Sequence, residues 1–126
     1  MKIAISSMGA SLEDSLDSRF GRCAYFQIYD TETKEGKAIQ NKGQISGGGA
    51  GIAAAQQLID EHIDIIITGN LGPNAFNLID KTDIKVYKSA VVDVNSAIKE
   101  YREGNLSELK SMVAPHTGMN MGGNRK

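Results

Sequence analysis

Two arginines and two glycine-containing segments give this sequence the means to bind an anion. Arg19 and Arg22 stand three positions apart, and each guanidinium carries a permanent charge and several hydrogen-bond donors. Gly47–Gly51 precedes a helical pattern, and Pro73 follows a second glycine-containing stretch at a position typical of a helix start. The N–H groups and the dipole at a helix start favour negative charge. These residues predict an anion site if the fold brings them together.

The glycine run at Gly47–Gly51 differs from the familiar phosphate-binding loops. It lacks the Gly-Lys-Ser/Thr ending of a P-loop. Residues 49–54 match a loose dinucleotide-binding pattern, but no buried strand clearly precedes them, and no acidic residue ends the next strand at Thr68. The run is therefore either a cradle for a ligand or a loop whose glycines let the helix pack closely. A nucleotide- or phosphate-binding regulatory or enzymatic domain that uses this loop is the alternative function.

Cys23 and His116 are the candidate metal ligands. Cys23 is the only thiol, so the chain forms no internal disulfide. A lone cysteine at the start of a strand is commonly a small buried hydrophobe, whereas Arg22 beside it would lower the thiol pKa and favour metal binding. His116 is either a solvated side chain or a partner of Met119 and Met121 in soft metal contacts.

Hydrophobic periodicity predicts the elements that must position these residues. The expected strands are Lys2–Ser7, Ala24–Asp30, Lys37–Asn41, Ile63–Thr68 and Ile84–Tyr87. The expected helices are Ile52–His62, a segment beginning at Pro73, and Val94–Arg102, with a final helical turn or two in Leu106–Val113. The first helix should bury one stripe, formed by Ile52, Ala55, Leu58, Ile59 and His62.

The order β-β-β-α-β-α-β-α predicts an α/β fold with a mixed sheet of about five strands, ribonuclease H-like topology and helices on both faces. The later strands should be parallel with right-handed crossovers, and the first three should form a meander. Ligands of such sheets bind at the carboxyl ends of the parallel strands. The binding residues predicted at this rim are Ser7, Arg19, Phe20, Gly21, Arg22, Gly49, Gly51, Gly69, Asn70, Gly72 and Asn74.

Length and composition predict a single globular domain. The 126 residues are 40% hydrophobic and 23% charged. We expect the domain to span residues 1–114 and a flexible tail rich in glycine, methionine and asparagine to span residues 115–126. A net charge of −1 gives no reason to expect nucleic acid, and no apolar run approaches the roughly 20 residues of a membrane span. Without a secretion signal, the cytoplasm is the expected compartment.

No catalytic constellation is evident in the sequence. Neither a Ser–His–Asp order with a nucleophile elbow nor a His-Glu-x-x-His motif is present. A nuclease of ribonuclease H-like shape needs carboxylates at its strand ends to hold metal ions, but the first strand ends in Ser6 and Ser7. We therefore expect a binding protein and not an enzyme.

Four segments in the first 102 residues carry a family resemblance. They are the opening strand into Ser7, residues 17–26, residues 49–56 and residues 68–76. The most specific part is Arg19-Phe20-Gly21-Arg22 followed by Gly69-Asn70-Leu71-Gly72-Pro73-Asn74-Ala75. Together they resemble the dinitrogenase iron–molybdenum cofactor biosynthesis and carrier family, in its short stand-alone members.

The resemblance implies a ribonuclease H-like fold without nuclease activity. It also implies transient binding of an anionic iron–sulfur or iron–molybdenum cluster or its precursor, in a nitrogenase accessory role. Cluster donor and acceptor proteins are the implied partners. On this hypothesis Arg19 and Arg22 neutralise the cluster and Cys23 is a candidate ligand. Cofactor-handling members tend to have histidine after the Phe-Gly pair, where this chain has Arg22.

Overall fold

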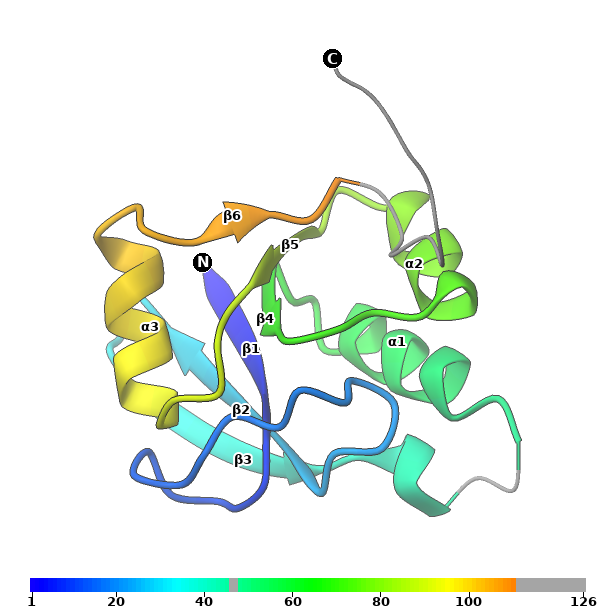
Figure 1. Cartoon of the computed structure of the whole chain (residues 1–126), viewed down its shortest axis with the longest axis horizontal. Coiled ribbons are helices and arrows are strands. Elements are labelled where there is room, and N and C mark those ends of the chain that lie inside the picture. The colour runs from blue at the N-terminus through cyan, green and yellow to red at the C-terminus, as the bar shows by residue number, and fades with distance from the viewer. Residues whose placement is uncertain (46–47, 111–126) are drawn as a thin grey trace.

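A mixed sheet of six strands forms the centre of the protein, in the order β3-β2-β1-β4-β5-β6 (Figure 1). The computed structural model describes residues 1–45 and 48–110. Its strands are β1 (Lys2–Ser7), β2 (Tyr25–Asp30), β3 (Gly36–Gln40), β4 (Ile65–Thr68), β5 (Lys85–Lys88) and β6 (Ser107–Glu108). β1, β2 and β3 pair antiparallel as a meander, while β1, β4 and β5 are parallel. The predicted α/β class and sheet arrangement are confirmed.

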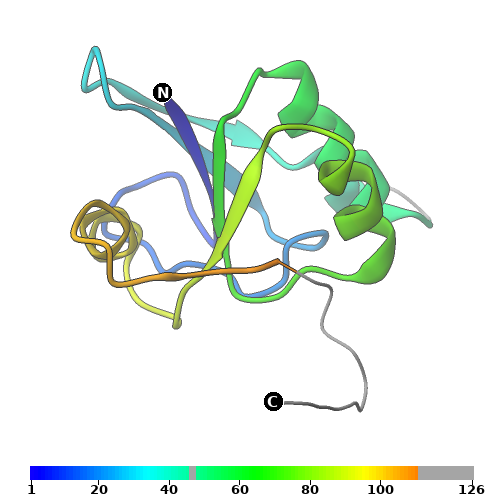
Figure 2. The same cartoon turned by 90° about the horizontal axis from the view of Figure 1, so that it is seen from above.

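Helices cover both faces of the sheet, as predicted. α1 (Ala50–Asp60) and α2 (Pro73–Asp80) lie on one face, and α3 (Val94–Arg102) lies on the other (Figure 2). A short 3-10 helix, η1 (Lys42–Ile45), precedes α1. Successive residues of a strand point to opposite faces, so Ala4 packs toward α1 and α2 while Ile3 and Ile5 pack toward α3. This double burial explains the continuous apolar runs of the central strands.

The prediction of a final helical segment at Leu106–Val113 is wrong for the part that the structure describes. Ser107 and Glu108 form β6, which pairs antiparallel with β5. The N–H of Leu109 also donates to the carbonyl oxygen of Val86 at 2.7 Å. The exposed edge of β5 offers these hydrogen-bond partners, which a local sequence pattern does not reveal.

The predicted stripe of α1 is wrong at both ends. Ile52 is 46% exposed, because Ala54, Ala55 and Leu58 turn toward the sheet. His62 follows the end of the helix in a left-handed conformation, with φ 58°, and is exposed. His62 is therefore not part of the core.

The predicted tail, residues 115–126, and with it His116, lies outside the described residues. No helix in residues 1–45 and 48–110 has the length and apolar character needed to cross a membrane.

Candidate functional site

A pocket of about 400 Å³ lies between residues 19–22, here called the arginine loop, and the starts of α1 and α2. It is lined by Arg19, Phe20, Gly21, Arg22, Gly49, Ala50, Gly51, Ile52, Asn70, Gly72, Pro73, Asn74 and Ala75. Nine of the eleven predicted binding residues belong to this lining, all except Ser7 and Gly69. The structure thus brings together residues from three separate stretches of the chain.

Ser7 and Gly69 do not line the pocket. The Ser7 hydroxyl donates to the Gly9 carbonyl at 2.7 Å and accepts from the Gln27 amide at 3.0 Å. The backbone of Gly69 lies against Ser18, where an added Cβ would be 2.6 Å from the Ser18 Cβ. Gly69 therefore lets the residue before Arg19 lie close to the end of β4, whereas Ser7 holds the start of the connection between β1 and β2.

Two helix starts meet at the pocket without side-chain caps. α1 begins after Gly49, which has φ 67°, and α2 begins after Gly72, which is extended. An added Cβ on Gly51 would lie 3.3 Å from the Cβ of Ala75, so this glycine allows the two helices to approach closely. The first N–H groups of an α-helix have no partner inside the helix and carry partial positive charge. The geometry favours an anion in front of both helices.

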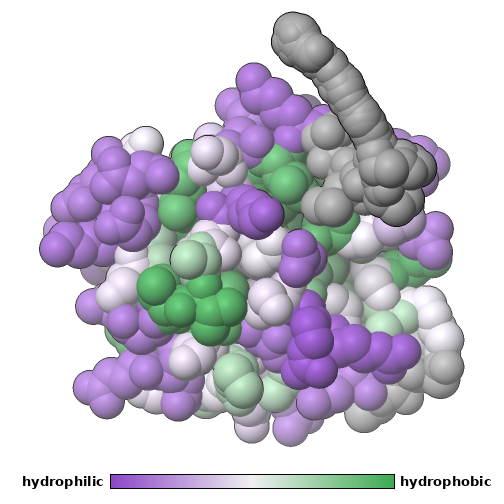
Figure 3. Space-filling model, in the orientation of Figure 1, coloured by the Kyte–Doolittle hydropathy of each residue, from purple (hydrophilic) through white to green (hydrophobic). Residues whose placement is uncertain are grey.

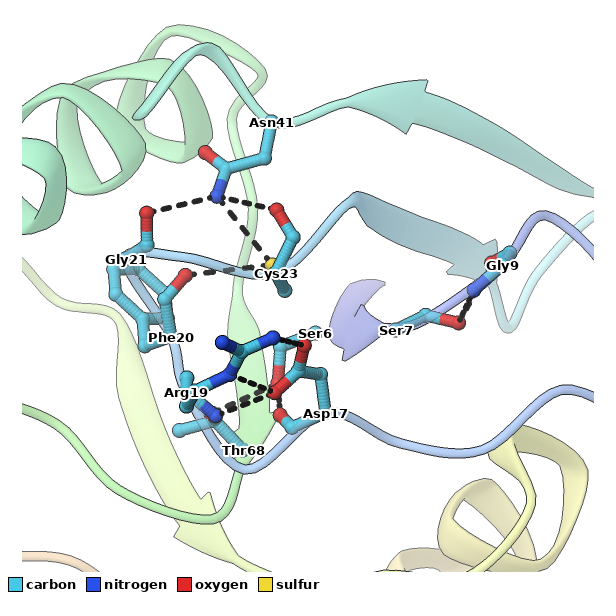
Figure 4. Close-up of polar contacts among 10 residues, drawn as sticks. All are labelled: Ser6, Ser7, Gly9, Asp17, Arg19, Phe20, Gly21, Cys23, Asn41 and Thr68. Carbon is cyan, nitrogen blue, oxygen red and sulfur yellow. Dashed lines mark hydrogen bonds and ion pairs between the residues drawn. The ribbon is translucent and has the colours of Figure 1, made fainter. Parts of the chain in front are cut away.

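Asp17, two residues before Arg19, holds the Arg19 side chain in place (Figure 4). Its carboxylate accepts from Arg19 Nη2 at 2.9 Å, from Nε at 3.1 Å and from the Arg19 backbone N–H at 2.9 Å. The Asp17 side chain is 6% exposed and that of Arg19 is 65% exposed. These hydrogen bonds from Arg19 hold the pKa of Asp17 below its usual range.

Arg22 supplies charge that no neighbour neutralises within residues 1–45 and 48–110. Its side chain is exposed and makes no ion pair or hydrogen bond to a described residue. None of the described residues that line the pocket is acidic. Strongly hydrophilic side chains gather over the connection between β1 and β2 in Figure 3, where the arginine loop lies. The pocket is therefore cationic.

Replacing Asp17 with asparagine should lower the free energy of unfolding at pH 7. The pKa of Asp17 is lower in the folded protein than in the unfolded chain. The ionised Asp17 therefore adds to the free energy of unfolding above the ordinary carboxyl pKa of about 3.9, and this contribution is lost as the pH falls through the pKa of the folded state. Urea unfolding should thus separate Asp17→Asn from wild type at pH 7 and bring them closer below about pH 4. Exposed Asp83→Asn is the control, and an equal gap at both pH values would contradict the prediction.

Cys23 is buried and does not have the lowered pKa that its neighbour Arg22 suggested. Its thiol is fully buried, donates to the Phe20 carbonyl at 3.4 Å and lies 3.5 Å from Asn41 Nδ2. Burial raises the pKa of Cys23 to about 12. Arg22 instead points its side chain outward, so adjacency in sequence does not place the charge near the sulfur. Such a thiol is poorly suited to ligate a metal.

Alkylation of Cys23 by iodoacetamide at pH 8 should be at least a thousandfold slower in the folded protein than in urea. The pKa rises from 9.0 to about 12, which lowers the thiolate fraction by about that factor, and burial adds a barrier. Between pH 9.0 and about 12 the folded protein keeps the Cys23 proton while the unfolded chain loses it. The free energy of unfolding should therefore fall as the pH rises through this range. Rapid alkylation of the folded protein would show that the thiol is accessible.

Of the two predicted metal ligands, Cys23 lies in the described part of the chain and His116 lies outside it. Residues 1–45 and 48–110 contain no group of three or more histidine, cysteine, aspartate or glutamate side chains placed to hold a metal ion.

Two buried polar residues near the pocket, Asp17 and Asn41, were not predicted. Asp17 could have been found from the Asp-x-Arg spacing, since aspartate often accepts a hydrogen bond from the backbone N–H two residues on.

These features define a small α/β protein with a cationic pocket at the carboxyl edge of its parallel strands. The family model described as dinitrogenase iron-molybdenum cofactor matches residues 1–104, and the chain belongs to this family. The predicted resemblance is confirmed.

Two solved structures share the fold of this chain, and a third relative is similar in sequence. The apo form of the orange protein from Desulfovibrio gigas is 32% identical with a TM-score of 0.82, covering 86% of this chain and 92% of that one. A NifB-like protein from Thermotoga is 31% identical with a TM-score of 0.80, covering 91% and 98%. An uncharacterized protein of Methanocaldococcus jannaschii is 27% identical, covering 87% of this chain and 97% of the relative.

Proposed function

We propose that this protein is a non-catalytic carrier whose pocket holds an anionic iron–sulfur or molybdenum–iron–sulfur cluster, or a precursor of one, for transfer. The observation that carries the proposal is the meeting of two helix starts that have no side-chain cap with Arg19 and Arg22, around a pocket whose described lining has no acidic residue. Backbone N–H groups and guanidinium groups are donors suited to the sulfide or oxide surface of such an anion. Family membership supports a cargo of this class.

The donor set favours a cargo held by hydrogen bonds and charge. The single thiol of the chain, Cys23, is fully buried, and burial raises its pKa to about 12, so it stays protonated at neutral pH. A cluster in the pocket would keep its own sulfide or oxide ligands and exchange without breaking a bond to the protein. That mode suits a carrier, which must release its cargo.

A donor and an acceptor of the cluster are the partners that this function requires. Arg22, Asn70 and Asn74 are exposed on the lining, so a partner protein could reach the cargo there. We propose a cytoplasmic nitrogenase accessory role in which nucleic acid is not a partner, in keeping with the net charge of −1.

Anaerobic reconstitution tests the proposal. Protein purified without oxygen is incubated with ferrous iron and sulfide, with and without molybdate, and then desalted. Retained iron and sulfide-to-iron charge-transfer absorbance are expected, and Cys23→Ala should retain as much as wild type. Loss of the cluster in Cys23→Ala alone would make the thiol a ligand. Absence of retained metal in the wild type would refute the carrier proposal.

The nucleotide alternative lacks the geometry of a dinucleotide site. α1 follows the short helix η1 and not a parallel strand, whereas the dinucleotide-binding turn joins a strand directly to its helix. A thermal-shift screen with nucleotides separates the alternatives, because a ligand at 100 times its Kd stabilises by about 2.7 kcal/mol. A shift with a nucleotide, together with no retention of iron, would favour the alternative.

A further inference from the structure

Asn41 lies beneath the arginine loop and joins it to the segment that leads into α1. The residue is 2% exposed and follows β3 directly. Its amide nitrogen Nδ2 donates to the carbonyl oxygen of Gly21 at 3.1 Å and to that of Cys23 at 2.9 Å (Figure 4). These two carbonyls belong to the residues on either side of Arg22. Asn41 itself does not line the pocket.

The amide oxygen of the same side chain holds a second segment. Oδ1 accepts from the backbone N–H of Gly43 at 2.8 Å. Gly43 packs tightly enough that an added Cβ would collide with the Ala50 carbonyl oxygen and lie 2.9 Å from the Gly21 carbonyl oxygen. One buried amide therefore connects the arginine loop to the residues that precede the first turn of α1.

Arg22 depends on its backbone for its direction more than Arg19 does. Asp17 holds the guanidinium of Arg19 by two hydrogen bonds. The guanidinium of Arg22 has no such partner in residues 1–45 and 48–110. The direction of the Arg22 guanidinium therefore depends on the backbone of residues 21–23, which the Asn41 amide holds at the Gly21 and Cys23 carbonyls.

We propose that Asn41 is a positioning residue that holds the backbone carbonyls of Gly21 and Cys23, the residues on either side of Arg22, and so directs the Arg22 guanidinium toward the anion. The inference rests on the proposed function and deepens it. Asparagine suits the position because its side chain combines two donor hydrogens with an acceptor. Aspartate keeps the size and the bond to Gly43 but loses both donors.

Backbone ¹⁵N relaxation of the cargo-free protein tests the clamp directly. The Arg22 amide should be rigid in wild type, with an order parameter near about 0.85, and should fall below about 0.6 in Asn41→Ala. Asn41→Asp should mobilise Arg22 as well, and serves if the alanine variant does not fold. Gln57→Ala is the matched control, because this buried amide bonds to Gln40 and Lys42 but not to the arginine loop. An Arg22 amide as rigid in the Asn41 variants as in wild type would overturn the inference.

A double-mutant cycle then tests whether the clamp acts through Arg22. Retention of the cluster reconstituted from ferrous iron and sulfide should weaken about tenfold in Asn41→Ala and at least as much in Arg22→Gln. The double variant should be no weaker than Arg22→Gln alone, since there is then no guanidinium left to position. Multiplying losses would show that Asn41 acts independently of Arg22 and would contradict the proposal. If wild type retains no cluster, the proposed function fails, while the relaxation data still decide the role of Asn41.

Discussion

Replacing Arg22 with glutamine is expected to weaken retention of the reconstituted cluster by about 10- to 100-fold, as is typical when a hydrogen bond to a charged group is removed. Arg22 has the largest expected effect because its charge is unpaired among the described residues, whereas Arg19 shares its charge with Asp17. Metal retained after desalting, measured over a dilution series, gives the change in affinity.

The Arg22 prediction has a matched control at the far side of the sheet. Arg102 is an exposed arginine in the last turn of α3, and Arg102→Gln removes the same charge without touching the pocket. Raising the ionic strength should weaken wild type more than Arg22→Gln, because salt screens exposed charges. Equal loss in the two variants would mean that net charge, and not the pocket, holds the cargo.

Replacing Gly21 with alanine is expected to disturb both the fold and the pocket. An added Cβ would lie 2.9 Å from the Gly51 nitrogen and 3.0 Å from the Gly51 Cα. These are backbone atoms of the first turn of α1 and cannot rotate away, so the arginine loop must move off the helix. Overpacking of this kind costs about 1–3 kcal/mol. Urea unfolding should show that loss, and cluster retention should fall with it.

Gly36→Ala provides the comparison for Gly21→Ala. At Gly36 the nearest atom to an added Cβ is the Ile28 carbonyl oxygen, at 3.5 Å, which is an ordinary contact. That variant should stay within about 0.5 kcal/mol of wild type and retain the cluster. Wild-type stability and retention in Gly21→Ala would show that the arginine loop and α1 do not depend on close contact.

The framework of the site was predictable from local patterns. β1 and β4 are apolar on both faces, which indicates central strands of a sheet covered by helices. Parallel strands bring their carboxyl ends to one edge, so the arginine loop and the two helix starts could be expected to meet there. The pocket confirms that meeting.

The prediction failed where the outcome depends on partners distant in the sequence. Asn41 and Gly21 are 20 positions apart, and nothing near either residue reveals that one amide holds both sides of Arg22. β6 likewise depends on the free edge of β5, and not on its own two residues. Hydrogen bonds of this kind are set by packing across the fold.

The sequence by itself determined the class of fold, the family and the cationic character of the rim, because periodicity and residue type act locally. Only the tertiary structure decided the environment of each group. Cys23 follows Arg22 directly, yet its thiol is fully buried and its pKa rises to about 12 while the arginine faces solvent. Desolvation depends on the atoms that surround a group in space, and successive residues can face opposite environments.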